Sequence, residues 1–307
     1  MKSVIPKVSI GLPVYNGQQY IRFAIESLLS QSFSDFELII CDNASTDATQ
    51  DICMEYIRRD IRVSYNRSEV NFGAAPNFNR AFKLSRGQYF KWAAYDDVCR
   101  SDFLLNCVKS LDMDDSIVLA YPRTTEIDES GREIRNFDQH LSLGAEKPSD
   151  RLKELLVGHS ACYEVFGLIR SNILGGTKLI GPYIGSDRVL LAALALKGRF
   201  FEVSEYLFLR RNHSATSWDT MSKDPASLAK WFDTRADSRA PMATWRLLRE
   251  YMKVIVSADI SIGQKMSCLG ILMKWLRINR RTMQDELLRA SGLISKKTDS
   301  EPASNEC

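Results

Sequence analysis

The first part of the chain alternates short apolar runs with segments whose apolar residues recur at helical spacing. Ile21, Ala24, Ile25 and Leu28 show this spacing, which predicts an amphipathic helix. Strands and helices that alternate over such short distances predict a mostly parallel sheet flanked by helices, hence an α/β fold. The apolar runs that predict strands are Val8–Val14, Phe36–Cys41, Ile61–Tyr65, Tyr89–Tyr95 and Ile117–Tyr121.

The rest of the chain is less regular and ends in a long helical pattern. Gly131 lies in a polar segment and predicts a hairpin turn, whereas residues 225–288 carry helical spacing. Between them we predict helices at Leu152–Val157 and Val189–Leu196, and strands at Glu164–Arg170, Phe200–Val203 and Leu207–Arg211. We therefore divide the chain into a domain over residues 1–220, with halves 1–122 and 123–220, a helical C-terminal extension over 221–295, and a disordered tail over 296–307.

Composition is that of an ordinary globular protein. Hydrophobic residues make up 45% and charged residues 26%, and a net charge of +3 is too small to indicate nucleic acid as a partner. The longest apolar run, Val189–Leu196, falls far below the roughly 20 residues that a membrane-spanning helix needs. The 7 cysteines are odd in number and form no C-x-x-C pair, so neither a disulfide framework nor a zinc site is indicated. These features favour a cytoplasmic protein.

Acidic residues follow two of the predicted strands. Asp42 ends one apolar run, and Asp96 and Asp97 end another. Because ligands of parallel sheets bind beyond the carboxyl ends of the strands, we expect these acids to face one crevice. Adjacent carboxylates repel each other unless a cation relieves them, and Mg²⁺ or Mn²⁺ commonly links carboxylates to substrate phosphates. Taken singly, each acid fits better as a cap of the following helix.

The turn after the first strand carries no phosphate-binding motif. Tyr15-Asn16-Gly17 stands where a G-x-G-x-x-G loop would begin, and no G-x-x-x-x-G-K-[ST] occurs in the chain. Dinucleotide binding of the Rossmann type and a P-loop therefore lose their main support. A phosphate ligand would have to be bound in another way, which favours a metal ion.

Taken together, the motifs resemble family 2 glycosyltransferases, which are inverting enzymes with the GT-A fold. Each piece is short, but the order of the pieces over about 100 residues makes the resemblance specific. The likeness extends over roughly residues 7–215 and implies a GT-A, Rossmann-like sheet. The segments that carry it are VSIGLPVYNG at Val8–Gly17, LLSQSF at Leu28–Phe33, FELII at Phe36–Ile40, CDNASTD at Cys41–Asp47, NFG at Asn71–Gly73 with Asn77 and Asn79, and the pair Asp96-Asp97.

The resemblance implies roles in binding a nucleotide-sugar donor. Asp42 would contact the base, and Pro13 and Tyr15 would line the same pocket. Many members have a second acid where this chain has Asn43, which can donate as well as accept hydrogen bonds. The family's N-x-G segment adds Asn71, Gly73 and Asn77 to the donor site. Asp96 would lie near the ribose and the metal, and Asp97 would be the direct ligand of Mn²⁺ or Mg²⁺.

The resemblance also assigns residues in the second half. Asp187 occupies the place of the general base that deprotonates the acceptor hydroxyl, although Ser186 replaces the acid that usually precedes it. Capping of the following helix is the alternative role for Asp187, and the two roles are compatible. Arg210 and Arg211 resemble the family's R-R-x-H loop, which can close over the diphosphate. His213 would be an additional metal ligand or a structural residue.

The C-terminal helices combine apolar and basic residues. Trp275 and Leu276 lie beside Lys274 and Arg277, a pattern that can bind an anionic membrane surface or pack on the chain's own domain. Contact with the inner face of a membrane would suit a lipid-linked acceptor.

Together these features predict an inverting, metal-dependent glycosyltransferase of surface-polysaccharide or cell-envelope biosynthesis. Its donor would be a UDP-sugar, with dTDP- or GDP-sugars as alternatives, and its acceptor a glycan or a lipid-linked glycan. One alternative is a nucleotidyltransferase that makes nucleotide sugars, but such an enzyme would carry a basic loop where Leu12–Gln19 has neither Lys nor Arg. The other is a catalytically silent nucleotide-binding protein of the same fold.

Overall fold

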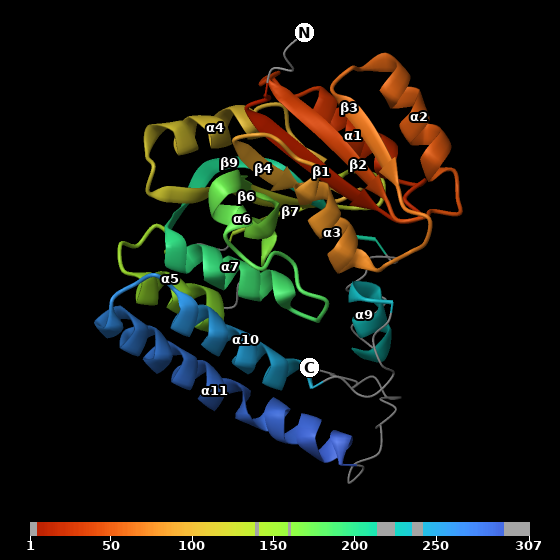
Figure 1. The fold of residues 1–307 in the computed structure, drawn as a ribbon. Coiled ribbons are helices and arrows are strands. Elements are labelled where there is room, and N and C mark those ends of the chain that lie inside the picture. Colours follow the sequence, from red (N-terminus) through yellow and green to blue (C-terminus); the bar gives the residue numbers. More distant parts are fainter. Residues whose placement is uncertain (1–4, 139–140, 159–160, 214–224, 235–241, 292–307) are drawn as a thin grey trace, which may run out of the picture.

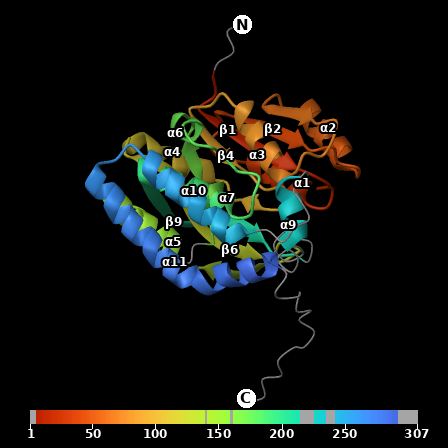
Figure 2. The same ribbon diagram turned by 60° about the horizontal axis from the view of Figure 1, so that its bottom comes forward.

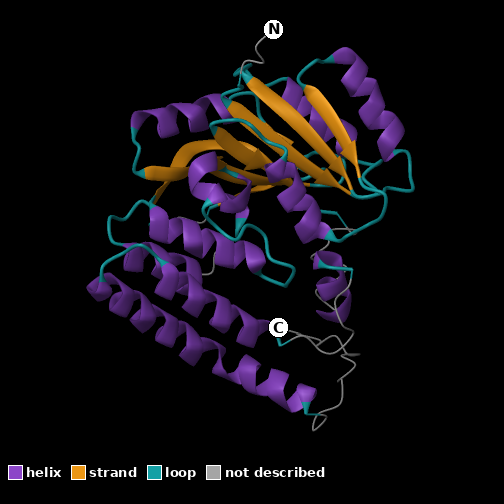
Figure 3. Cartoon of the chain, viewed as in Figure 1, coloured by secondary structure: helices purple, strands orange, loops and turns teal. Residues whose placement is uncertain are grey.

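The computed structural model describes residues 5–138, 141–158, 161–213, 225–234 and 242–291. Within them, one mixed sheet lies between two layers of helices, and further helices form an outer layer (Figures 1 and 3). The predicted tail over 296–307 lies outside the described residues. The α/β architecture expected from the strand and helix pattern is confirmed, and it agrees with the GT-A fold that the family resemblance implies.

The sheet has a parallel half and a mixed half. Its order is β3-β2-β1-β4-β8-β6-β9-β5, with β7 paired to β6. Neighbouring strands among β1 to β4 run parallel, whereas β8 runs antiparallel to both β4 and β6. The strands are β1 (Val8–Val14), β2 (Phe36–Asp42), β3 (Val63–Arg67), β4 (Tyr89–Trp92), β5 (Val98–Cys99), β6 (Ile117–Ile127), β7 (Glu133–Phe137), β8 (Leu168–Arg170) and β9 (Arg199–Arg211).

Helices cover both faces of the sheet. The helices α1, α2 and α4 pack in one core cluster with β1, and α3, α5, α7, α10 and α11 contribute to the cluster on the other face. The helices are α1 (Ile21–Leu29), α2 (Thr49–Arg59), α3 (Ala74–Lys83), α4 (Phe103–Met113), α5 (Pro148–Val157), the 3-10 helix η1 (Tyr163–Phe166), α6 (Ser171–Gly175), α7 (Ser186–Lys197), α9 (Pro225–Phe232), α10 (Ala243–Ser257) and α11 (Ile262–Ala290).

The central strand β1 shows why its sequence forms a covered strand. All its residues are buried, as expected for a parallel strand with helices on both faces. Gly11 lies on the face covered by α3, where an added Cβ would come within 2.8 Å of Ala81 Cβ and of Phe90 Cζ. The missing side chain therefore allows α3 to approach β1 closely, which places the start of α3 beside the strand's carboxyl end.

Two strand predictions in the second half need correction. Phe200–Val203 and Leu207–Arg211 belong to the single strand β9, because pairing with β6 continues through register shifts around Arg123. The polar residues between the two apolar runs stay in the strand with their side chains toward solvent. The predicted strand Glu164–Arg170 begins instead with η1, which follows Cys162 at a φ of 64°, and only Leu168–Arg170 pairs in the sheet.

The C-terminal helices α10 and α11 form an antiparallel layer far from β1 (Figures 1 and 2). The layer packs on α5 and α7, and Tyr251, Leu272 and Trp275 share a buried cluster with residues of the sheet. A capping box starts α11: Ser261 accepts from the Gln264 backbone, and the Gln264 side chain accepts from the Ser261 backbone. Among the described helices, none combines the length and apolar character needed to cross a bilayer.

Candidate active site

Polar side chains gather where β1, β2 and β4 end. Val14 and Asp42 are paired at the last position of β1 and β2, and β4 runs parallel to β1 on its other side. The loops that follow these strands therefore leave the sheet at one edge. We call residues 15–20, 42–48 and 93–97, together with 211–213 at the end of β9, the carboxyl edge.

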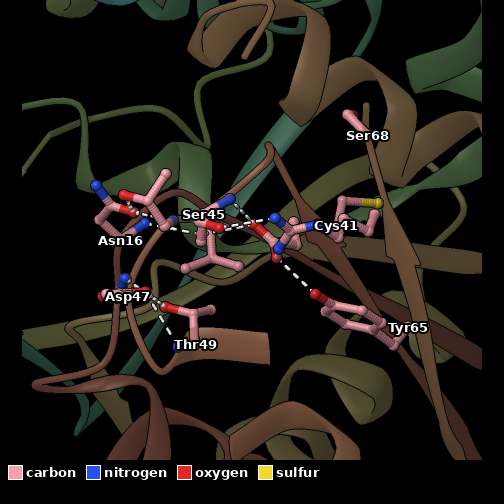
Figure 4. A network of polar contacts seen from close by, with 12 residues as sticks. Asn16, Cys41, Ser45, Asp47, Thr49, Tyr65 and Ser68 are labelled. Carbon is pink, nitrogen blue, oxygen red and sulfur yellow. Dashed lines mark hydrogen bonds and ion pairs between the residues drawn. The ribbon is translucent and has the colours of Figure 1, made fainter. Parts of the chain in front are cut away.

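Asp42 is the most heavily bonded carboxylate of the carboxyl edge. It is fully buried, and its Oδ1 accepts hydrogen bonds from the Ser45 backbone at 2.8 Å and the Ser45 hydroxyl at 2.6 Å. Its Oδ2 accepts from the Tyr65 hydroxyl at 2.5 Å and from Arg67 Nη1 at 2.8 Å (Figure 4). Asp42 thus folds the loop back on the strand and neutralises Arg67 before any ligand is present.

The loops after β1 and β2 are tied together by side chains that the sequence reasoning did not select. Asn16 Oδ1 accepts from the Thr46 backbone at 2.8 Å, and the Gly17 backbone donates to Thr49 Oγ1 at 2.8 Å. Asp47 accepts from the Gln18 backbone at 3.0 Å and from the Thr49 hydroxyl (Figure 4). Burial raises the pKa of Asp47, but these hydrogen bonds outweigh it and lower the pKa overall. The spacing D-x-x-S-x-D-x-T, read as a pair of linked Asx and Ser/Thr turns, is the signal that could have found them.

Asn43 holds the predicted donor loop Asn71–Gly73 in place. Its Nδ2 donates to Asn71 Oδ1 at 2.7 Å and to the Gly73 carbonyl at 3.0 Å, and its Oδ1 accepts from the Phe72 backbone at 3.1 Å. An ionised aspartate could not make the two donations. Gly73 has a φ of 91°, and an added Cβ would lie 2.7 Å from the Phe232 carbonyl of α9. Glycine is therefore required both by backbone conformation and by space.

Asn77 and Asn43 line a pocket of about 310 Å³ beside this loop, together with Ser68, Phe72, Pro76 and Arg80. Asn77 Nδ2 donates to the Cys41 carbonyl at 2.7 Å, which links the start of α3 to the end of β2. Asn77 Oδ1 is buried and has no hydrogen-bond partner within the described residues. The pocket therefore combines amide, hydroxyl and guanidinium groups with the Phe72 ring and Pro76.

Asp96 and Asp97 lie past β4 and are both partly buried. Asp97 Oδ1 accepts from the Arg211 backbone at 2.9 Å, and Asp96 Oδ2 lies 3.0 Å from His213 Nε2. Burial, together with the negative charge of Asp96, raises the pKa of Asp97 to about 8. The structure thus brings Asp96 beside His213 and Asp97 beside the Arg211 backbone, and a positive charge would stabilise the two neighbouring carboxylates.

Arg211 and Arg210 differ sharply in their surroundings. Arg211 is buried, donates from Nε to the Asp96 carbonyl at 2.8 Å, and lies with its guanidinium 4.9 Å from the Tyr20 ring centroid. It also donates from Nη1 to the carbonyls of Asp128 and Glu129, so Nε and Nη1 both hold the loop. Arg210 is partly exposed and bonds Asn212, which leaves further donors on its guanidinium.

The donor set at Asp96 and Asp97 fits a divalent cation only in part. Two carboxylates and one imidazole are ligands that Mn²⁺ accepts, and oxygen ligands suit Mg²⁺. Among the described residues, no group of three or more His, Cys, Asp or Glu is arranged to hold a metal by itself. A cation here would therefore need oxygen ligands from a bound diphosphate, which is the usual arrangement of such ions with phosphorylated substrates.

Asp187 lies apart from this edge, in the first turn of α7. Its Oδ1 accepts from the Arg188 backbone at 2.9 Å, and the N-cap position belongs to Gly185, whose φ is 76°. Burial raises the pKa of Asp187. Within the described part of the chain, no hydrogen bond or ion pair joins it to Asp42, Asp96 or Asp97. The neighbouring Ser186 hydroxyl is buried with no partner among the described residues.

Pro13 and Tyr15 flank the end of β1 as expected. Pro13 is buried within the strand, whereas the Tyr15 side chain is 43% exposed at the rim of the carboxyl edge. Tyr15 is thus free to contact a ligand. The six cysteines in the described residues are free and buried, so none of them forms a disulfide there.

Comparisons with known proteins relate the chain to glycosyltransferases. The chain is 32% identical over 232 residues to the uncharacterized glycosyltransferase RP339 of Rickettsia prowazekii, covering 70% of this chain and 67% of that protein. It is 27% identical over 252 residues to the putative teichuronic acid biosynthesis glycosyltransferase TuaG of Bacillus subtilis, covering 78% of this chain and 92% of that protein.

Solved structures share the fold at lower identity. S. aureus TarS 1-349 in complex with UDP-GlcNAc matches with a TM-score of 0.68 and 18% identity, covering 95% of this chain and 76% of that chain. The mannosyltransferase PcManGT of Pyrobaculum calidifontis, in complex with GDP-Man and Mn²⁺, matches with a TM-score of 0.52 and 15% identity, covering 94% and 87%. The family model described as glycosyl transferase family 2 matches residues 9–173, more than half of the chain. The chain therefore belongs to glycosyl transferase family 2.

Proposed function

We propose that this glycosyltransferase is a metal-dependent, inverting enzyme that takes its sugar from a UDP-sugar donor. The observation that carries the proposal is the partly buried pair Asp96 and Asp97, in which burial and the charge of Asp96 raise the pKa of Asp97 to about 8. Such a pair favours a cation, and the incomplete ligand set favours a cation that arrives with a diphosphate. The nucleotidyltransferase alternative gains no support, because the turn after β1 is tied down by neutral and acidic side chains.

The nucleotide would lie over the carboxyl edge. Tyr15 offers an exposed ring, and Asp42 and Asn43 set the shape of the base pocket through the loops that they hold. Asn77 lines the adjacent pocket, Asn71 and Gly73 belong to the loop that Asn43 holds beside it, and Pro13 is buried near the end of β1. TarS binds UDP-GlcNAc, which makes a UDP-sugar the first donor to test, and PcManGT binds GDP-Man, which makes GDP-sugars the second.

The leaving diphosphate needs positive charge while the glycosidic bond breaks. Asp97 and Asp96 would hold Mn²⁺ or Mg²⁺, with His213 beside them, and the ion would neutralise the charge that develops on the diphosphate. Arg210 has unused donors for phosphate oxygens. Arg211 is a positioning residue in this proposal, because its backbone holds Asp97 and its side chain holds the Asp96 carbonyl.

Asp187 would be the general base. As an acceptor hydroxyl oxygen attacks the anomeric carbon, its proton passes to the Asp187 carboxylate, and the bond from that carbon to the diphosphate oxygen breaks with its electron pair. Burial raises the pKa of Asp187, which makes it a better base than an exposed aspartate. The acceptor would be a glycan or lipid-linked glycan of a cell-envelope polymer, as the name of TuaG suggests.

A donor screen tests the proposal. Hydrolysis and transfer would be measured with UDP-, GDP- and dTDP-sugars, with Mn²⁺, with Mg²⁺ and with a chelator, for the native chain and Asp97→Asn. We expect turnover with a UDP-sugar that requires the metal, and a loss on the order of 10²- to 10³-fold in Asp97→Asn. Metal-independent turnover would contradict the metal site, and absence of nucleotide binding would favour the catalytically silent protein.

A further inference from the structure

The long helix α11 presents one face to solvent along its whole length. Cys268, Leu272 and Trp275 are buried on its inner side, whereas Met266 and Met273 on the opposite side are 62% and 51% exposed. The helix spans 29 residues, which corresponds to about 44 Å at the standard rise. This exposed face, carried by residues 262–284, is not covered by another described helix or strand (Figures 1 and 2).

The same face is strongly basic. Lys265, Lys274, Arg277, Arg280 and Arg281 are the charged residues between Ile262 and Gln284, and no acid occurs in that stretch. All but Lys265 are exposed, and none of those four has an ion pair within the described residues. At about 100° per residue, Met266, Met273, Arg277 and Arg281 fall within one arc of about 80°.

We propose that this face of α11 docks the enzyme on an anionic lipid bilayer. Unpaired cations in a row suit a surface of anionic headgroups, and each contributes to attraction within the screening distance of the membrane. The exposed side chains of Ile262, Met266 and Met273 favour a bilayer over a soluble polyanion as the partner, because a nucleic acid or acidic glycan would leave them in water. Burial at the boundary between headgroups and acyl chains removes them from water.

The helical layer that carries the docking face borders the acceptor side of the proposed active site. Leu247 of α10 lies against Gly185, where an added Cβ would be 3.2 Å from its Cδ2, and Arg246 lies 4.4 Å from the Tyr183 ring centroid. Glu286 of α11 in turn binds the Thr244 backbone at 2.9 Å. One end of the layer therefore flanks the start of α7, where Asp187 lies. This connection to a lipid-linked acceptor rests on the proposed function, whereas the docking itself does not.

Vesicle binding of the full chain tests the inference. Sedimentation with phosphatidylglycerol–phosphatidylcholine vesicles, with pure phosphatidylcholine as reference, would compare the native chain with Lys274→Gln/Arg277→Gln/Arg281→Gln. We expect salt-sensitive binding to the anionic vesicles and a loss of about 100-fold in the triple variant, since each cation contributes roughly 1 kcal/mol near such a surface. The control Arg58→Gln/Lys83→Gln/Lys109→Gln changes the net charge equally at exposed sites on α2, α3 and α4 and should bind like the native chain.

A second variant separates a bilayer from a soluble polyanion. Met266→Gln/Met273→Gln should weaken vesicle binding by on the order of 10-fold and leave binding of inorganic polyphosphate unchanged. Unchanged vesicle binding in this variant, equal losses in the basic variant and its control, or absence of binding to anionic vesicles would each overturn the inference. Donor hydrolysis in solution is measured separately, so that failure of docking is distinguishable from failure of the catalytic proposal.

Discussion

At the carboxyl edge, polar side chains hold the chain together, whereas in the layer of α10 and α11 the contacts are mostly apolar. The Asp42 carboxylate accepts four hydrogen bonds, and the side-chain amide of Asn43 makes three. In the helical layer, Tyr251 and Trp275 pack ring to ring with centroids 5.5 Å apart. Polar contacts require particular atoms at particular positions, whereas apolar packing accepts many residues of similar volume.

This difference explains which region carries recognisable motifs. The family model matches residues 9–173 and thus includes Asp42, Asn43, Asp96 and Asp97, while Asp187 and the layer lie beyond it. A site built from polar contacts requires particular residues at particular positions. A layer built from apolar packing requires only a pattern of apolar and polar positions. Under the proposed function, donor contacts belong to the carboxyl edge, and acceptor and membrane contacts belong to residues beyond the matched range.

The largest expected effect separates the two sides of the active site. In Asp187→Asn, transfer should fall by on the order of 10²- to 10⁴-fold, because the acceptor hydroxyl loses its base, while donor affinity stays unchanged. Calorimetry with the nucleotide and steady-state kinetics would measure both quantities. Asp150→Asn in the first turn of α5 is the matched control for helix capping alone. Weakened nucleotide binding in Asp187→Asn would place this residue on the donor side instead.

Much of the parallel half could be predicted from sequence, because each buried strand there is a short apolar run. β1 was predicted with its observed bounds, and Asp42 is the last residue of β2. The strand predicted over Tyr89–Tyr95 ends at Trp92 instead, so Asp97 lies in the loop between β4 and β5. The single strand β9 could not be predicted, because its middle residues are polar and only pairing with β6 keeps them extended. The network of Asn16, Asp47 and Thr49 depends on two loops meeting in space, which periodicity along one chain does not show.

Removal of Trp275 should act on stability alone. This side chain is 7% exposed and lies between the layer and the rest of the fold, so Trp275→Ala should cost about 3–5 kcal/mol in the free energy of unfolding. Urea denaturation would measure the loss, and nucleotide calorimetry on the folded fraction should show unchanged affinity. Trp275→Phe, which keeps an aromatic ring against Tyr251, should lose much less. A parallel loss of nucleotide affinity would show that the two regions are coupled.

Asp42 offers the converse test, because its contacts lie within the carboxyl edge. Asp42→Asn should cost about 1–3 kcal/mol, since Asn cannot accept all four hydrogen bonds and Arg67 loses its partner. It should also weaken nucleotide binding. Glu37→Gln at the other end of β2 breaks a comparable ion pair with Arg86, 2.7 Å from Glu37, and should leave nucleotide affinity unchanged. If Asp42→Asn and Glu37→Gln changed nucleotide affinity equally, the role of Asp42 would be purely structural.

The smallest expected effect concerns the pH dependence of stability at the carboxyl edge. The pKa of Asp97 is about 8 in the folded chain and near 3.8 in the unfolded chain, so folding favours its protonated form. Ionisation therefore opposes folding, and stability falls as the pH rises from about 4 to 8 in the absence of divalent metal. Because Asp97 is partly exposed, we expect this loss to be only about 1–2 kcal/mol.

Asp97→Asn keeps an oxygen for the Arg211 backbone and should remove that part of the pH dependence. Thermal unfolding with a chelator from pH 5 to pH 8 would measure this pH dependence in both proteins. Addition of Mn²⁺ should restore stability in the native chain but not in the variant. An identical pH profile of the two proteins would mean that Asp97 is not electrostatically destabilised.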